Sequence, residues 1–119
     1  MEIIITDSKS IKEIQQEFQN TFPYLKIEFF RNVQKNGSAP VKPQPIPDKM
    51  TIGMVRHVHA EGTLDIAGSR SVEEIEKDFR DKFGLSVEVF RKSGNMWIGT
   101  TFTHHWPLLR QNHEGQQMS

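Results

Sequence analysis

Histidine spacing is the first feature of this sequence that suggests chemistry. His57 and His59 stand two residues apart in a segment that we expect to form a strand, where alternate side chains point the same way. Side chains at that spacing are able to chelate zinc or nickel. His104 and His105 are adjacent, and aligning MTIGM with MWIGT makes His105 equivalent to His59. We nevertheless expect exposed histidines at strand ends, and no metal site.

Other signatures of catalysis are missing from the sequence. The chain contains no cysteine, which excludes thiolate nucleophiles, disulfides and sulfur-ligated metals. No Gly-x-Ser-x-Gly nucleophile motif occurs, and the glycines form no phosphate-binding loop. We therefore expect no catalytic residues and no cofactor, and enzymatic activity is the least supported of the functions considered.

A set of aromatic and basic side chains is the best candidate for a binding surface. Phe30 and Phe90 fall on the strand face opposite the core residues of their own strands. A two-residue turn at Ser93-Gly94 would pair Phe90 with Trp97 on that face. The face is either a binding surface or covered by the terminal helix or a second subunit, and we favour coverage. The candidate ligand or partner surface comprises Phe30, Arg31, Phe90, Arg91, Lys92 and Trp97.

An internal repeat supplies the elements that would carry these residues. Residues 10–31, SIKEIQQEFQNTFPYLKIEFFR, resemble residues 71–91, SVEEIEKDFRDKFGLSVEVFR. Upstream, IIITDSKS resembles LDIAGSRS, and downstream residues 50–54 (MTIGM) resemble residues 96–100 (MWIGT). Each copy therefore predicts the order strand, helix, strand, strand.

The helix of each copy is defined by its ends and its apolar stripe. Ser10 and Ser71 are each followed three residues later by glutamate, the pattern of a capping box. Pro23 stops the first helix, and Gly84 offers the second a left-handed cap. The residues that share one helical face are Ile11, Ile14, Phe18 and Phe22 in the first copy and Val72, Ile75, Phe79 and Phe83 in the second.

These elements predict a single α+β domain over residues 1–119. Two pseudo-symmetric β-α-β-β repeats would form a largely antiparallel sheet with both helices packed on it, and a ferredoxin-like topology is the alternative. The first repeat spans residues 2–58 and contains a proline-rich loop, residues 32–49. The second repeat spans residues 62–105, and the segment 106–119 adds a short helix with proline at its start and glycine near its end.

Composition limits the classes of partner. The 119 residues carry no net charge, so bulk electrostatics select neither nucleic acid nor a membrane surface. No signal peptide and no apolar run long enough to cross a bilayer is evident, so we expect a cytoplasmic protein. We predict a non-enzymatic binding or protein-interaction domain, a homodimer through exposed sheet surface or edges. The alternative is single-stranded nucleic-acid or anionic-ligand binding through the basic, aromatic side of the hairpin.

The second half of the chain resembles an uncharacterised family of small bacterial proteins. The resemblance lies in FGLSVEVFRKSGNMWIGTT and in the positions that follow it, Trp106, Gln111, Asn112 and Gly115. It implies a bacterial, cytoplasmic origin and no particular activity. In that family the positions of His104 and His105 can be acidic, which argues against a histidine metal site here.

Overall fold

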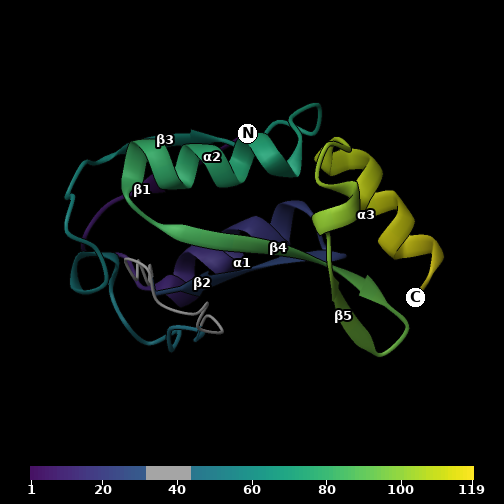
Figure 1. The fold of residues 1–119 in the computed structure, drawn as a ribbon, viewed down its shortest axis with the longest axis horizontal. Coiled ribbons are helices and arrows are strands. Elements are labelled where there is room, and N and C mark those ends of the chain that lie inside the picture. Colours follow the sequence, from purple (N-terminus) through teal and green to yellow (C-terminus); the bar gives the residue numbers. More distant parts are fainter. Residues whose placement is uncertain (32–43) are drawn as a thin grey trace, which may run out of the picture.

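The computed structural model describes residues 1–31 and 44–119 of the chain. Within these residues the fold comprises two antiparallel sheets and three α-helices (Figure 1), which confirms the predicted α+β class. The strands are β1 (Glu2–Ile5), β2 (Leu25–Phe30), β3 (Gly62–Asp65), β4 (Ser86–Ser93) and β5 (Met96–Gly99). The helices are α1 (Ile11–Thr21), α2 (Val72–Phe83) and α3 (Leu108–Gln117), with single 3-10 turns at Ile52–Met54 and Thr101–Thr103.

The strands are divided between two sheets, where the repeat predicts one. β1 pairs with β3 in a two-stranded sheet, and the other sheet has the order β2-β4-β5. α1 contacts β1 and β2, whereas α2 contacts β3 and β4. Each helix therefore packs against one strand of each sheet, and a single apolar core forms between these elements.

Both helices begin as their sequences predict. The Glu13 N–H donates to Ser10 Oγ at 3.1 Å, and the Ser10 N–H donates to Glu13 Oε1 at 3.2 Å. Ser71 and Glu74 form the same reciprocal pair at 3.1 and 3.0 Å. α2 ends at Gly84, whose φ of +64° is the left-handed cap expected of glycine.

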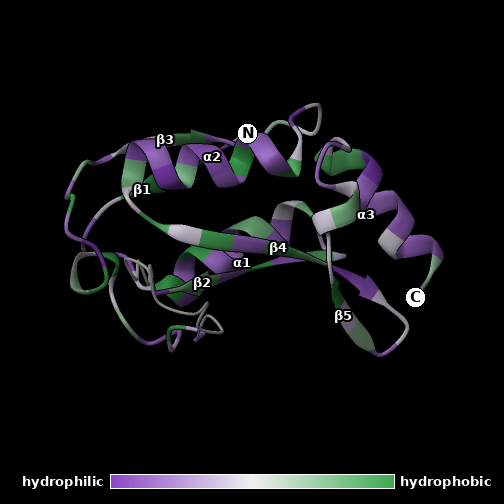
Figure 2. Cartoon of the chain, viewed as in Figure 1, coloured by the Kyte–Doolittle hydropathy of each residue, from purple (hydrophilic) through white to green (hydrophobic). Residues whose placement is uncertain are grey.

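The apolar stripe of each helix lies in the core. Figure 2 shows hydrophobic residues interspersed with hydrophilic ones along α1 and α2, as one-sided burial requires. Fully buried residues on these helices are Ile11, Ile14, Phe18, Val72, Ile75 and Phe79, and they meet Leu25, Ile27, Phe29 and Val89 from the sheet. The rings of Phe29 and Phe79 pack edge to face, 5.6 Å apart.

Both sheets pair residues that the sequence repeat matches. Ile3 lies opposite Leu64 in the β1–β3 pairing, and Glu28 lies opposite Glu88 in the β2–β4 pairing. Aligning the two copies matches these same residues with each other. The two halves of the chain therefore meet at equivalent positions in each sheet.

Hydrogen bonds before each helix extend this correspondence. The Ile52 N–H donates to the Lys9 carbonyl at 2.8 Å, and the Leu108 N–H donates to the Arg70 carbonyl at 2.7 Å. Ile52 and Leu108 are both fully buried. The 3-10 turn at Ile52–Met54 thus occupies, in its half, the place of the first turn of α3.

The sequence prediction for residues 50–54 is therefore wrong in two respects. They contain a 3-10 turn and not a strand, and their structural counterparts are residues 106–110 and not residues 96–100. The similarity of the two sequences suggested the match. In the structure the equivalent positions are instead those whose apolar side chain, Ile52 or Leu108, is buried beside the loop that precedes the helix.

The β4–β5 hairpin has a register two residues away from the predicted one. Its turn is Gly94-Asn95, with Gly94 at a φ of +61°, so Trp97 pairs with Lys92 and Phe90 pairs with Gly99. Because side chains alternate with a period of two, the shift leaves Phe90 and Trp97 on the same face. The predicted pairing is wrong, but the predicted sharing of a face is confirmed.

The proline-rich loop and the terminal segment complete the fold. Residues 32–43 of the predicted loop lie outside the described residues, and Pro45 forms an isolated bridge with Phe30 at the edge of β2. Gly115 lies near the end of α3, as predicted, at a position where an added Cβ would come within 2.8 Å of Tyr24 Cβ. In the described part of the chain, no helix has the length and apolar character that a bilayer crossing requires.

Candidate functional site

The face of the β2-β4-β5 sheet that points away from the core is here called the outer face. Residues that point inward, such as Ile27 and Phe29, are fully buried, whereas those that point outward are half-buried. α3 lies against the inward side, because an added Cβ on Gly115 would meet Tyr24 and the inward-pointing Arg91. The terminal helix therefore does not cover the outer face. The side chains of the outer face are those of Lys26, Glu28, Phe30, Ser86, Glu88, Phe90, Lys92 and Trp97.

Aromatic and basic side chains gather at one end of the outer face. Lys26 Nζ lies 5.7 Å from the centre of the Phe90 ring and 5.2 Å from that of Trp97. Lys92 Nζ lies 5.3 Å from the centre of the Trp97 ring. These distances suit cation–π attraction, which holds the two ammonium groups against the rings.

Two carboxylates lie side by side at the middle of the outer face. Glu28 pairs directly with Glu88, and Lys26 Nζ lies 3.4 Å from Glu28 Oε1. Among the described residues, no cation lies within ion-pair distance of Glu88. Glu88 Oε1 lies only 3.2 Å from where a Cβ on Gly99 would be, so glycine leaves room for this carboxylate.

A groove of about 670 Å³ runs over this part of the outer face. Its floor is the glutamate pair, and Phe30 and Phe90 stand on either side. The groove is lined by Lys26, Glu28, Phe30, Gln44, Pro45, Glu88 and Phe90. The aromatic rings on either side of the groove are of the type that is enriched where proteins contact each other.

Equivalent residues of α1 and α2 bond to the backbone of this sheet, one to β2 and the other to the central strand β4. Gln15 Nε2 donates to the Ile27 carbonyl at 2.8 Å, and Glu76 Oε2 accepts from the Val89 N–H at 3.2 Å. Burial raises the pKa of Glu76, the Val89 N–H opposes that rise, and the charge of Glu88 adds to it. The partly buried carboxylate of Glu76 is thus an ionisable group beside the candidate surface.

Two of the predicted surface residues lie apart from the outer face. The Arg91 Nη1 donates to Gln111 Oε1 at 2.7 Å, and its guanidinium lies 5.4 Å from the Trp106 ring. Arg91 follows Phe90 by one residue and therefore points to the opposite side of the strand. Arg31 is exposed beyond the end of β2 and joins the outer face through no described contact. Phe30, Phe90, Lys92 and Trp97 share the face as predicted.

The candidate metal ligands are not brought together. His57 and His59 lie in a loop and not in the predicted strand, and His59 Nδ1 lies 2.8 Å from Asp7 Oδ2. The rings of His104 and His105 are 6.1 Å apart, and His104 Nε2 lies 3.4 Å from Glu73 Oε2. Within residues 1–31 and 44–119, no group of three or more metal-ligating side chains forms.

The contact at Asp7 belongs to a network that the sequence does not predict. Arg56 is buried, and its Nε and Nη2 donate to Asp7 Oδ1 at 3.0 and 2.8 Å. Its Nη1 donates at 2.9 Å to the carbonyl of Phe83, at the end of α2. The hydrogen bond from Arg56 lowers the pKa of Asp7, burial opposes this, and His59 lowers it further. The network fastens the loop after the 3-10 turn to both halves of the chain.

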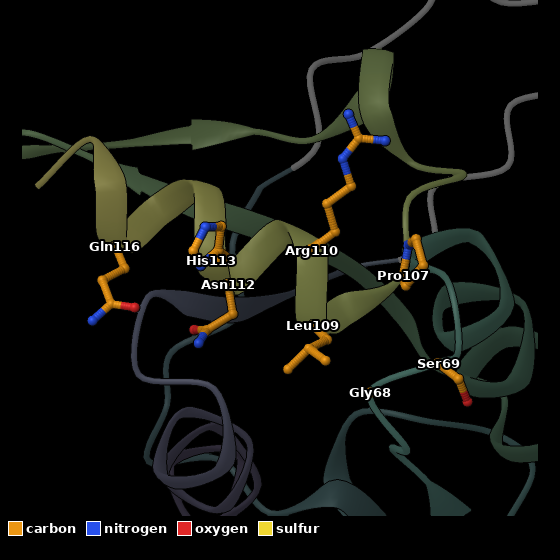
Figure 3. A pocket seen from close by; sticks show the side chains of 8 residues that line it. All are labelled: Gly68, Ser69, Pro107, Leu109, Arg110, Asn112, His113 and Gln116. Atoms are coloured by element: carbon orange, nitrogen blue, oxygen red, sulfur yellow. The ribbon is translucent and has the colours of Figure 1, made fainter.

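A second hollow, of about 890 Å³, lies beside α3 (Figure 3). Leu109, Asn112 and Gln116 project on one side of the helix, and Arg110 projects on the other. Gly68 lies opposite Leu109, where an added Cβ would come within 3.2 Å of the leucine Cβ. Leu109 is largely exposed in this open hollow, and the ionisable residues that line it are Arg110 and His113.

The positions that carried the family resemblance have structural roles here. Gln111 is buried and donates to the Thr103 carbonyl at 2.6 Å in addition to accepting from Arg91. Asn112 Oδ1 accepts from the Tyr24 N–H at 2.8 Å, and Trp106 stacks with Arg110 at 3.8 Å. These contacts fix α3 to the sheet and indicate no ligand.

Comparison with known proteins supplies no relative from which a function could be transferred. No family model matches the chain, and neither a curated protein nor a solved structure matches it.

Proposed function

We propose that this chain is a non-enzymatic protein-interaction domain that uses the outer face of its three-stranded sheet. The observation that carries the proposal is the groove between Phe30 and Phe90, with the glutamate pair as its floor. Half-buried aromatic residues are typical of surfaces that become buried in a complex.

A nucleic-acid partner has less support from the same residues. Glu28 and Glu88 occupy the middle of the face, where they would repel phosphates. Arg91 lies on the other side of the sheet and adds no positive charge to the surface. Nucleic-acid binding stays an alternative prediction, and a fluorescence titration with a single-stranded oligonucleotide at low salt tests it.

The experiment that tests the proposed function places a photoreactive amino acid at Trp97. A matched variant carries the same group at Lys12, which is exposed on α1. We expect specific crosslinks from position 97 and none from position 12. A captured protein is then purified, and its affinity for the wild-type chain is compared with its affinity for W97A by calorimetry. Equal affinities, or equal crosslinking from both positions, would contradict the proposed surface.

A further inference from the structure

The charges of the outer face are ordered in rows across the strands. Lys26 and Phe90 form one row of the β2–β4 pairing, and Glu28 and Glu88 form the next. Neighbouring rows on one face are about 7 Å apart, because every second residue points the same way. A row with one positive charge therefore borders a row with two negative charges.

This order makes the face complementary to itself in one orientation. Consider a two-fold axis that lies in the interface, perpendicular to the strands and between the two rows. It sets the Lys26 row of one copy over the Glu28 row of the second copy, and the reverse. Lys26 of each copy then lies over Glu28 of the other, and the Phe90 ring lies over Glu88. An axis parallel to the strands would instead set Glu28 over Glu88, which like charges oppose.

In the favoured orientation each strand lies over its own counterpart, so Lys92 of one copy lies over Ser86 of the other. The row that contains Lys92 and Trp97 then lies over the row that contains Phe30 and Ser86. Packed sheets lie about 10 Å apart, which side chains of this size fill.

We propose that two copies of this chain associate through their outer faces in this antiparallel register, with Lys26 of each copy paired to Glu28 of the other. The inference rests on the proposed function, because it names a second copy as the partner of the outer face. The interface contains few residues, so association is weak and concentration-dependent.

Charge exchange between two variants tests the register. K26E places negative charges at both β2 positions, 26 and 28. E28K places positive charges at both positions. Each variant alone sets like charges against each other across the two-fold axis, so we expect at least about tenfold weaker association for each. An equimolar mixture places opposite charges at both contacts, so we expect a one-to-one heterodimer at least as tight as the wild-type dimer.

Sedimentation equilibrium from about 10 µM to 1 mM measures these associations, and native mass spectrometry identifies the heterodimer. K12E and E114K change the net charge equally at positions away from the outer face, and we expect both to associate as the wild type does. Circular dichroism verifies that each variant is folded.

Two outcomes would overturn the inference. One is a wild-type chain that stays monomeric at about 1 mM. The other is a dimer that K26E and E28K weaken no more than the two controls do, which places the contact on another surface. Either outcome leaves the proposed function standing if position 97 crosslinks to a different protein. The proposed function fails separately if position 97 captures no protein whose affinity for the chain is lowered by W97A.

Discussion

Glu28 and Glu88 lie directly opposite each other across β2 and β4, and both side chains project from the outer face. Like charges at paired positions of an antiparallel sheet lower its stability. Lys26 offsets this for Glu28, but no cation of the described residues reaches Glu88. Local conflicts of this kind are expected at functional sites.

The conflict predicts that removing one carboxylate stabilises the isolated chain. We expect E88Q to raise the free energy of unfolding by about 0.2–1 kcal/mol, measured by urea denaturation. E114Q removes the same charge from α3 and should change this free energy by less than about 0.5 kcal/mol. A loss of stability in E88Q would mean that the carboxylate has a structural role.

Arg56 is expected to be the most sensitive charged residue of the fold. R56M leaves Asp7 and the Phe83 carbonyl without their donor, which costs about 2–3 kcal/mol of unfolding free energy. R80M removes an exposed guanidinium from α2 and should cost less than about 0.5 kcal/mol. Chemical denaturation of both variants makes the comparison, and equal effects would contradict the role of Arg56.

The loss of stability at acidic pH is expected to depend on Asp7. Its pKa in the folded chain is lowered from the ordinary value of 3.8, so its contribution is present above that pH. The contribution is lost as pH falls through the lower, folded pKa. We expect the melting temperature of D7N to fall less steeply than that of the wild type below about pH 4, with D48N as the control. Parallel curves would exclude this role of Asp7.

Glu76 should give the opposite pH dependence. Its pKa in the folded chain is raised from the ordinary value of 4.5, so stability declines as pH rises from that value through the folded pKa. E76Q keeps an oxygen to accept from the Val89 N–H and places glutamine where the first half has Gln15. We expect E76Q to melt at a higher temperature than the wild type at pH 7 and to lose this difference near pH 4. A difference that does not change with pH would contradict the assignment.

Gly115 is expected to resist replacement although it lies within a helix. Alanine favours helix by about 1 kcal/mol, but its Cβ would lie within 2.8 Å of Tyr24 Cβ and 3.0 Å of the Tyr24 carbonyl oxygen. Overpacking of this kind costs about 1–3 kcal/mol, so we expect a net loss of stability in G115A. Q116A, on the exposed side of α3, is the control, and equal melting temperatures would contradict the close approach.

Local signals in the sequence predicted the local structure well. The capping serines, the apolar stripes and Gly84 each act through neighbouring residues, and each takes its predicted role. The hairpin register was missed because Gly94 can occupy either position of a two-residue turn, and the two choices move the pairing by two residues.

Features that depend on distant residues were not predictable in the same way. Nothing near Arg56 in sequence indicates that it reaches Asp7 and Phe83, because these contacts exist only once both halves have folded. Arg91 was predicted to belong to the surface because Phe90 and Lys92 flank it in sequence. It lies beyond the last core residue of β4, where its side chain bonds to Gln111. The glutamate pair follows from the repeat only when the register between β2 and β4 is known.

The pairing of equivalent residues also determines how the chain must fold. Apart from the β4–β5 hairpin, both strand pairings join residues about 60 positions apart, one from each half. Helices and the hairpin can form within microseconds, but neither sheet can close until the two halves find each other. We therefore expect a slow refolding rate for a chain of this length, with the two halves gaining protection from hydrogen exchange in one step.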